Sequence, residues 1–197
     1  KKNIIDHSTN KINPDNLDKN TAILKKELSN TVSKYMISDV GLGVFLSSGI
    51  DSTLITSITN EISSKPIKTF TIGFEDRRYD ESHDAKLIAN YLKTDHYEKI
   101  FNKKDLLNIV PNIHNIYDEP FADSSQLPTF LLSSLASQHV KVVLSGDGGD
   151  ELFGGYNRYM FVDKIWNNIK FFPLFLRKYS KNFLLNLSEK NKYTISM

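Results

Sequence analysis

The chain has 197 residues, of which 40% are hydrophobic and 24% charged, and its formal net charge is +2 at pH 7. This size and composition predict one globular domain with a sizeable core, and so small a charge argues against nucleic acid or an anionic membrane as a partner. The chain has no cysteine, no visible signal peptide and no apolar run long enough to span a bilayer, so we exclude a cysteine nucleophile and expect a cytoplasmic protein.

The first forty residues combine a polar lead with one amphipathic helix. Residues 1–13 are polar, and from about residue 15 apolar residues recur at helical spacing as far as Tyr35. We interpret residues 1–40 as a lead followed by a packing helix.

Strand-like and helix-like patterns alternate from residue 41 to residue 160. The expected strands are 42–46, 67–72, 95–101 and 141–145, and the expected helices are 53–63, 81–92, 103–117 and 127–138. This alternation predicts an α/β fold, a parallel sheet of about five strands with helices on both faces. Residues 161–197 are rich in apolar and aromatic side chains, and we expect them to form a helical extension that is truncated.

A turn of small residues, Ser47–Ser52, separates a buried strand from a helix. Backbone N–H groups and the positive end of a helix meet at such a turn, which suits phosphate. No Gly-Lys-Ser/Thr follows, so this is not the common nucleotide-triphosphate loop, and the turn instead carries the carboxylate of Asp51. Taken alone, an ordinary Ser/Asp cap at a helix start explains the hexamer equally well.

A second unusual stretch, Ser145–Tyr156, contains five of the nine glycines of the chain together with Asp147, Asp150 and Glu151. Glycine lets a backbone approach a ligand closely, and carboxylates can hold Mg²⁺ against phosphate oxygens. In an open parallel sheet, loops at the carboxyl ends of strands meet at one edge. We therefore expect Asp51 and Asp150 to share one metal ion; the alternative is a flexible acidic turn with helix-capping acids.

Four stretches in this order resemble the synthetase domain of glutamine-dependent asparagine synthetases and their relatives, including β-lactam synthetase. These stretches are Val44–Ser52, Thr69–Ser82, Asp118–Phe130 and Val142–Tyr159. The resemblance implies the fold of the adenine nucleotide α-hydrolases with a pyrophosphate loop, of the pattern Ser-Gly-Gly-x-Asp-Ser. Ser48 replaces one of its glycines, which the loop tolerates only if the φ angle of Ser48 is negative.

The resemblance also implies roles for individual residues. Nucleotide contacts are implied at Leu46, Ser47, Ser48, Gly49, Ile50, Asp51, Ser52, Ile72, Ser145 and Gly146. Magnesium ligands are implied at Asp51 and Asp150. Catalytic roles are implied at Asp147, where asparagine synthetases often carry a Glu that supports the acyl-adenylate step, and at Glu151, a position linked to the handling of pyrophosphate.

The reaction that the resemblance implies is the ATP-dependent amidation of a carboxylate, with Mg²⁺ as cofactor. L-aspartate would become L-asparagine with release of AMP and pyrophosphate, and ammonia would come from a glutaminase domain that this chain lacks, or from a partner. The alternatives are amidation of another carboxylate, such as a sugar acid of a surface polysaccharide, and a non-catalytic nucleotide-binding module. Retention of Asp51, Asp150 and Glu151 argues against the non-catalytic module. Whether the protein forms a homo-oligomer stays open.

Two further groups of residues are candidates for the substrate pocket. Asp118, Glu119 and Asp123 lie in a loop before an expected helix near the same edge of the sheet. Arg77 and Arg78 either touch substrate or form a solvated charge cluster.

Overall fold

The structure is a computed structural model that describes residues 16–119 and 123–174. The chain forms two compact units, Lys1–Asp147 and Gly148–Met197, and each is described by itself. The division into a lead, a central domain and an extension stays a prediction. None of the helices in the described ranges is both long and apolar enough to cross a membrane.

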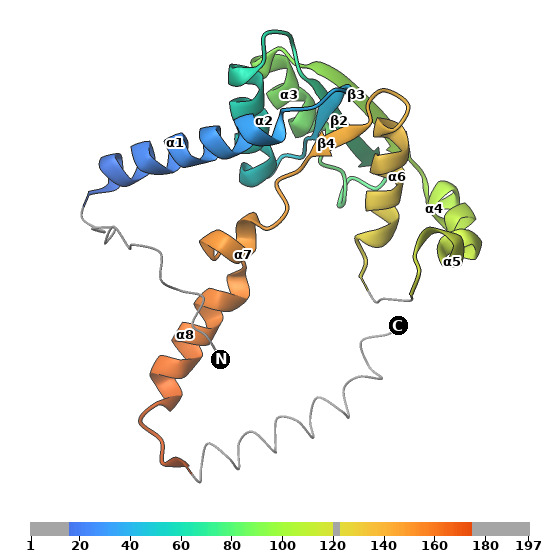
Figure 1. Cartoon of the computed structure of the whole chain (residues 1–197). Coiled ribbons are helices and arrows are strands. Elements are labelled where there is room, and N and C mark those ends of the chain that lie inside the picture. The colour runs from blue at the N-terminus through green and yellow to red at the C-terminus, as the bar shows by residue number, and fades with distance from the viewer. Residues whose placement is uncertain (1–15, 120–122, 175–197) are drawn as a thin grey trace. The chain divides into compact units, whose positions relative to one another are not determined.

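The first unit is built on a parallel sheet with the strand order β3-β2-β1-β4 (Figure 1). The strands are β1 Leu42–Phe45, β2 Lys68–Phe74, β3 Asp95–Phe101 and β4 Val142–Leu144. All three pairings are parallel, and Val44 of β1 lies opposite Thr69 on one side and Leu144 on the other. Within the described ranges the sheet thus has four strands, where the sequence predicts about five.

Helices alternate with these strands, as the sequence predicts. In the first unit they are α1 Leu17–Tyr35, α2 Ile50–Ile62, α3 Ser82–Leu92, α4 Lys103–Ile109, the 3-10 helix η1 Val110–Asn112, α5 Ile113–Ile116 and α6 Gln126–Ala136. The predicted helix 103–117 is interrupted by η1, because Pro111 has no N–H to donate. The second unit contains α7 Gly149–Phe153 and α8 Asn157–Ile169; residues 175–197 of the expected extension lie outside the described residues.

The core lies on both faces of the sheet. On one face, fully buried Phe70 of β2 packs against Leu135 and Ala136 of α6. On the other face, Leu46 packs against Ala85 and Ala89 of α3. The predicted covering of the sheet by helices on both sides is therefore confirmed.

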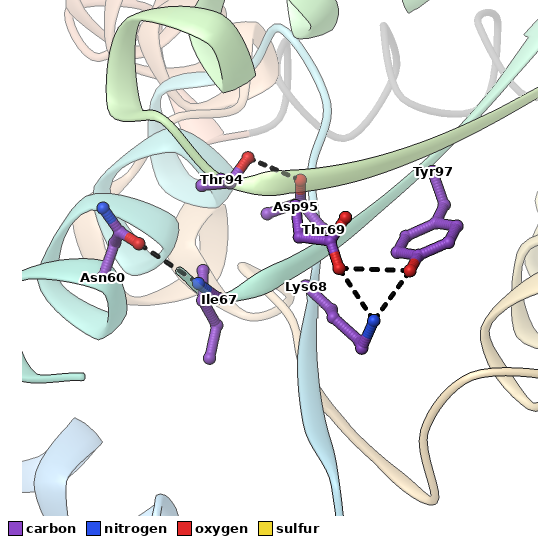
Figure 2. Close-up of polar contacts among 7 residues, drawn as sticks. All are labelled: Asn60, Ile67, Lys68, Thr69, Thr94, Asp95 and Tyr97. Carbon is purple, nitrogen blue, oxygen red and sulfur yellow. Dashed lines mark hydrogen bonds and ion pairs between the residues drawn. The ribbon is translucent and has the colours of Figure 1, made fainter. Parts of the chain in front are cut away.

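Polar side chains join β2 to β3 where these strands begin (Figure 2). The ammonium of Lys68 donates to Asp95 Oδ2 at 2.8 Å and to the Tyr97 hydroxyl at 2.7 Å, and that hydroxyl donates to Asp95 Oδ2 at 3.1 Å. The hydrogen bond from Lys68 is the main reason why the pKa of Asp95 lies below its usual range. This cluster supports the pairing of the two strands at the edge opposite to their carboxyl ends.

Asn60 of α2 connects three elements through its side-chain amide (Figure 2). Its Nδ2 donates to the carbonyl oxygen of Leu92 at the end of α3 at 2.8 Å. Its Oδ1 accepts from the N–H of Ile67, just before β2, at 3.3 Å. One side chain thus satisfies two backbone groups that no helix or strand satisfies.

Replacing Asn60 with alanine should lower the free energy of unfolding by about 1–3 kcal/mol, because it leaves both backbone groups without a partner. Urea unfolding followed by circular dichroism measures the change. Asn90→Ala is the matched control, since Asn90 is an exposed residue of α3, and it should change stability by less than about 0.5 kcal/mol. Equal losses in the two variants would contradict the bridging role of Asn60.

Stability should fall as the pH drops below about 6.5, because burial lowers the pKa of His96 below its ordinary value. Below that pH His96 takes up a proton in the unfolded chain before it does so in the folded chain. Above that pH the His96 imidazole is neutral in both states. The His96 Nδ1 lies 2.9 Å from Thr69 Oγ1, and Nε2 is buried without a hydrogen bond in the described part of the chain.

Urea unfolding between pH 8 and pH 5 measures this slope. The variant His96→Gln should have a shallower slope than the wild type, and His114→Gln, at an exposed position, should keep the wild-type slope. An unchanged slope in His96→Gln would contradict the assignment.

Candidate functional site

The sheet order places two loops beside each other at the carboxyl ends of its strands. From β1 the chain passes to β2 on one side, and it later returns to β4 on the other side of β1. A crevice forms at such a reversal in an open parallel sheet, and ligands bind there. The loop after β1 begins at Leu46 and leads into α2, and the loop after β4 begins at Ser145.

Two serine hydroxyls close the turn between β1 and α2. The Oγ atoms of Ser47 and Ser52 lie 2.8 Å apart. The N–H of Ser47 donates to Ser52 Oγ at 3.2 Å, and the N–H of Gly49 donates to Ser47 Oγ at 3.1 Å. The residues Ser47–Ser52, which we call the phosphate turn, therefore hold their shape through their own side chains.

The helix α2 begins at Ile50, three residues earlier than predicted, and its cap residue is Gly49, which has no side chain to cap it. The alternative prediction of a Ser/Asp cap is therefore wrong. Within the described ranges, the N–H groups of Ser48, Ile50, Asp51 and Ser52 donate to no acceptor. With the positive end of a thirteen-residue helix, these open donors make a site suited to an anion.

The loop after β4 touches the start of α2 at Gly146. A Cβ atom at this position would lie 2.6 Å from the backbone nitrogen of Ser52 and 2.8 Å from the carbonyl carbon of Asp51. No side chain larger than hydrogen fits so close to another backbone without a shift of one of them. The structure thus brings together the two glycine- and serine-rich loops singled out in the sequence.

Two polar side chains at the start of α2 are left open. The carboxylate of Asp51 is half-buried and has no hydrogen bond in the part of the chain that is described, and the Thr53 hydroxyl is buried there without a partner. Buried polar groups nearly always have a partner, so the orphaned hydroxyl of Thr53 marks a place that a ligand oxygen could satisfy. Together with the open N–H groups, these side chains fit a phosphate group and an accompanying cation.

Leu46 and Ile72 lie deeper in the fold than the residues of the turn. The N–H of Leu46 donates to Phe70 O at 3.0 Å, and its carbonyl oxygen accepts from Thr71 Oγ1 at 2.6 Å. The side chain of Ile72 packs near Phe70, and β2 continues past Ile72 to Phe74. At Leu46 only the second lone pair of the carbonyl oxygen remains for a ligand.

Ser48 is accommodated in the turn. Lys93 is the single non-glycine residue with a positive φ in the described ranges, so Ser48 meets the condition that the sequence sets. Its hydroxyl donates to Glu81 Oε2 at 2.9 Å. The sequence analysis missed Glu81; its one signal was its place at the end of the matching stretch 69–82.

Glu81 also lines a cavity at the carboxyl ends of β2 and β3. The cavity has a volume of about 730 Å³, and its apolar wall includes Phe74, Tyr79 and Phe101. Arg78 lies at the rim, where it pairs with Asp76 at 2.6 Å and holds the pKa of that carboxyl at about 2. Arg78 is thus exposed and paired with Asp76, and the two alternatives for its role stay open.

Asp147 and Glu151 each have a local hydrogen-bond partner. Ser145 Oγ donates to Asp147 Oδ2 at 3.0 Å and accepts from the Asp147 N–H at 3.3 Å, and the carboxylate of Asp147 is exposed. In the second unit, Asp150 and Glu151 lie in the first turn of α7, and Glu151 accepts from the Tyr156 hydroxyl at 2.5 Å.

Since Asp51 and Asp150 belong to different units, a metal ion shared by them stays a prediction. The residues that the structure describes contain no cluster of three metal-ligating side chains.

The loop before α6 contains one candidate with a structural explanation. The carboxylate of Asp123 accepts from the N–H of Ser125 at 2.8 Å and from its hydroxyl at 2.7 Å. The backbone hydrogen bond is the main reason why the pKa of Asp123 is lowered. Asp123 therefore shapes the entry to α6, whereas no hydrogen bond engages the carboxylates of Asp118 and Glu119 within the described residues.

Comparison with known proteins adds a family and a fold. The model of the asparagine synthase family matches residues 24–195. A relative from Methanocaldococcus jannaschii is 44% identical over 133 residues, which are 67% of this chain and 26% of that protein. Asparagine synthetase [glutamine-hydrolyzing] 1 of Bacillus subtilis is 39% identical over 142 residues, 72% of this chain and 22% of that protein. The chain thus spans about a quarter of the length of these relatives.

Among solved structures, NMN synthetase from Francisella tularensis superposes with a TM-score of 0.50 at 19% identity, over 68% of this chain and 58% of that one. A likeness at this level of identity concerns the fold alone.

Replacing Gly146 with alanine should lower the free energy of unfolding by about 1–3 kcal/mol, because the new methyl group would meet rigid backbone at the start of α2. Gly41→Ala is the matched control, since the nearest atom to a Cβ there, Val140 Cγ1, is at an ordinary 3.8 Å. Urea unfolding of both variants measures the difference. If Gly146→Ala were as stable as Gly41→Ala, the close approach of the two loops would be refuted.

Proposed function

Because the chain belongs to the asparagine synthase family, we propose that it binds ATP and joins an amine nitrogen to a carboxylate through an acyl-adenylate. Ammonia is the proposed nitrogen donor, and L-aspartate is the proposed acceptor, with L-asparagine, AMP and pyrophosphate as products. The relatives are named asparagine synthetases [glutamine-hydrolyzing], and this chain spans about a quarter of their length, so the activity of the whole protein is part of the proposal.

The phosphate turn is the observation that carries this proposal. It follows β1, the strand that lies between β2 and β4 in the sheet. Its open N–H groups at Ser48, Ile50, Asp51 and Ser52 can donate to negatively charged phosphate oxygens, and Gly146 closes the crevice from the side of β4. The phosphate turn has no lysine that could stay bound to the γ-phosphate while that phosphate is transferred. This arrangement favours cleavage between the α and β phosphates over transfer of the terminal phosphate.

The proposed steps follow from the chemistry of a carboxylate. An oxygen of the substrate carboxylate attacks the α-phosphorus of ATP, and the bond to the β-phosphate oxygen breaks, which releases pyrophosphate. The N–H groups of the phosphate turn stabilise the charge that develops on this leaving group. Ammonia then attacks the activated acyl carbon, loses a proton and displaces AMP, which leaves the amide.

We propose Asp51 and Asp150 as the residues that hold Mg²⁺, and Asp147 and Glu151 as the acids that serve the adenylation and pyrophosphate steps. When bound, Mg²⁺ would neutralise negative charge on the phosphate oxygens. Asp51 belongs to the phosphate turn, and its carboxylate makes no hydrogen bond in the described part of the chain, which supports Asp51 as a magnesium ligand. A glutaminase domain or a partner outside this chain is proposed as the source of ammonia.

Phosphorus NMR of the products tests the reaction. The protein that contains this chain is incubated with Mg-ATP, ammonium and L-aspartate, beside a sample without aspartate and one with a sugar acid. We expect AMP and pyrophosphate only where aspartate is present. Formation of ADP and phosphate would refute the proposed cleavage. Formation of AMP with the sugar acid but not with aspartate would identify the sugar acid as the substrate in place of aspartate.

Replacing Asp51 with asparagine should lower the rate of pyrophosphate release by about two orders of magnitude or more, because the turn loses the charge that holds the cation. The fold should persist, since Asp51 makes no hydrogen bond in the described residues. Asp84→Asn is the matched control, because Asp84 is an acid in the first turn of α3, and it should keep the wild-type rate. An unchanged rate in Asp51→Asn would refute the metal assignment.

A further inference from the structure

One hydrogen bond connects the phosphate turn to the loop after β2. The hydroxyl of Ser48 donates to Glu81 Oε2 at 2.9 Å, across 33 positions of the chain. Glu81 precedes α3 as its cap residue, but its side chain makes no hydrogen bond to the backbone of that helix. The carboxylate is therefore committed to Ser48 instead of to its own helix.

The backbone around Glu81 is fixed by its neighbour Asp80. Asp80 Oδ1 accepts from the N–H of Phe74 at 3.3 Å and from the N–H of Ser82 at 3.1 Å. These two bonds bind the end of β2 to the start of α3, and Glu81 lies between them. The backbone from which the Glu81 side chain extends is thus fixed by the half-buried carboxylate of Asp80.

This anchor requires a glycine in β2. A Cβ atom at Gly73 would lie 2.5 Å from Asp80 Oδ1 and 2.6 Å from Ser82 Oγ. The carboxylate of Asp80 therefore occupies the space that a side chain at position 73 would need. A continuous set of contacts leads from Gly73 through Asp80 and Glu81 to Ser48.

Ser48 is one of the four residues of the phosphate turn whose N–H groups donate to no acceptor in the described ranges. The hydroxyls of Ser47 and Ser52 tie the rest of the turn to itself, but neither of them engages the side chain of Ser48. The bond to Glu81 is therefore the contact that orients Ser48. We propose that Glu81 is a positioning residue that holds the N–H of Ser48 toward the β- and γ-phosphates of the nucleotide.

This inference rests on the proposed function, since it assumes that the turn binds the phosphates of ATP. It assigns to Glu81 the role of a hydrogen-bond acceptor, which glutamine can fill and alanine cannot. It also limits the effect of Glu81 to the phosphates beyond the α position, because adenosine contacts are expected elsewhere, at Leu46 and Ile72.

Equilibrium binding to the full 197-residue chain tests the role of Glu81. Isothermal titration calorimetry with Mg²⁺ present compares α,β-methylene-ATP, which cannot be cleaved between its α and β phosphates, with AMP, which lacks the outer two. Glu81→Ala and Ser48→Ala should each weaken binding of the ATP analogue by about three- to tenfold, the effect of losing one hydrogen bond. Binding of AMP should change by less than about twofold in either variant.

Three further variants separate positioning from a general structural effect. The double variant of Ser48 and Glu81 should bind no more weakly than either single variant, because both remove the same bond. Glu81→Gln should restore binding to within about twofold of the wild type. Glu75→Ala is the matched control, since Glu75 lines the same cavity and has no contact with Ser48, and it should bind as the wild type does.

The proposed function and the positioning role of Glu81 would be overturned by different results. If the wild type binds neither ligand, the proposed function fails and this inference fails with it. If the wild type binds but Glu81→Ala is unchanged or binds more tightly, the inference alone is overturned. Equal losses for AMP and the ATP analogue, additive losses in the double variant, or no rescue by glutamine would also overturn it.

Discussion

The strand β1 is hydrogen-bonded along both edges, to β2 and to β4, while helices cover both faces of the sheet. The four residues of β1 carry no polar side chain, and the serines and the carboxylate of the phosphate turn follow shortly after the strand ends. After β1 the chain continues to β2 on one side of that strand, and it later returns to form β4 on the other side. The phosphate turn, the loop of Gly146 and the contact to Glu81 all depend on this central position.

The loops at this edge are joined by short-range contacts of two kinds. The loop after β4 meets α2 through bare backbone at Gly146, where any side chain would collide. The loop after β2 meets the turn through a side chain, with Glu81 accepting from Ser48. Backbone contact sets how close two loops lie, whereas the side-chain contact orients one residue of the turn and can be removed by a single substitution.

Much of the fold could be predicted because each strand is a short β-branched or aromatic run and each long helix has helical periodicity. The start of α2 was placed three residues too late, since Ile50, Asp51 and Ser52 show no apolar period before the helix pattern begins. The interruption at Pro111 was likewise visible only as a residue inside an expected helix. Both errors concern the ends of elements, where local sequence says least.

The site was predictable only where its residues are neighbours in sequence. The serine and glycine patterns identified both loops, and the parallel sheet predicted that they meet. The bond between Ser48 and Glu81 has no local signal, because it joins residues that only the packing of α3 beside the sheet brings together. The partnership of Asp51 with Asp150 spans two units and stays a prediction.

The hydroxyls of Ser47 and Ser52 satisfy one another and the backbone around them, so the turn has its shape without any ligand. Such preorganisation reduces the entropy lost on binding. Donors that are already in place need no rearrangement when charge develops on a leaving group. The serine pair therefore contributes indirectly, because it fixes the backbone of the turn whose N–H groups face that charge.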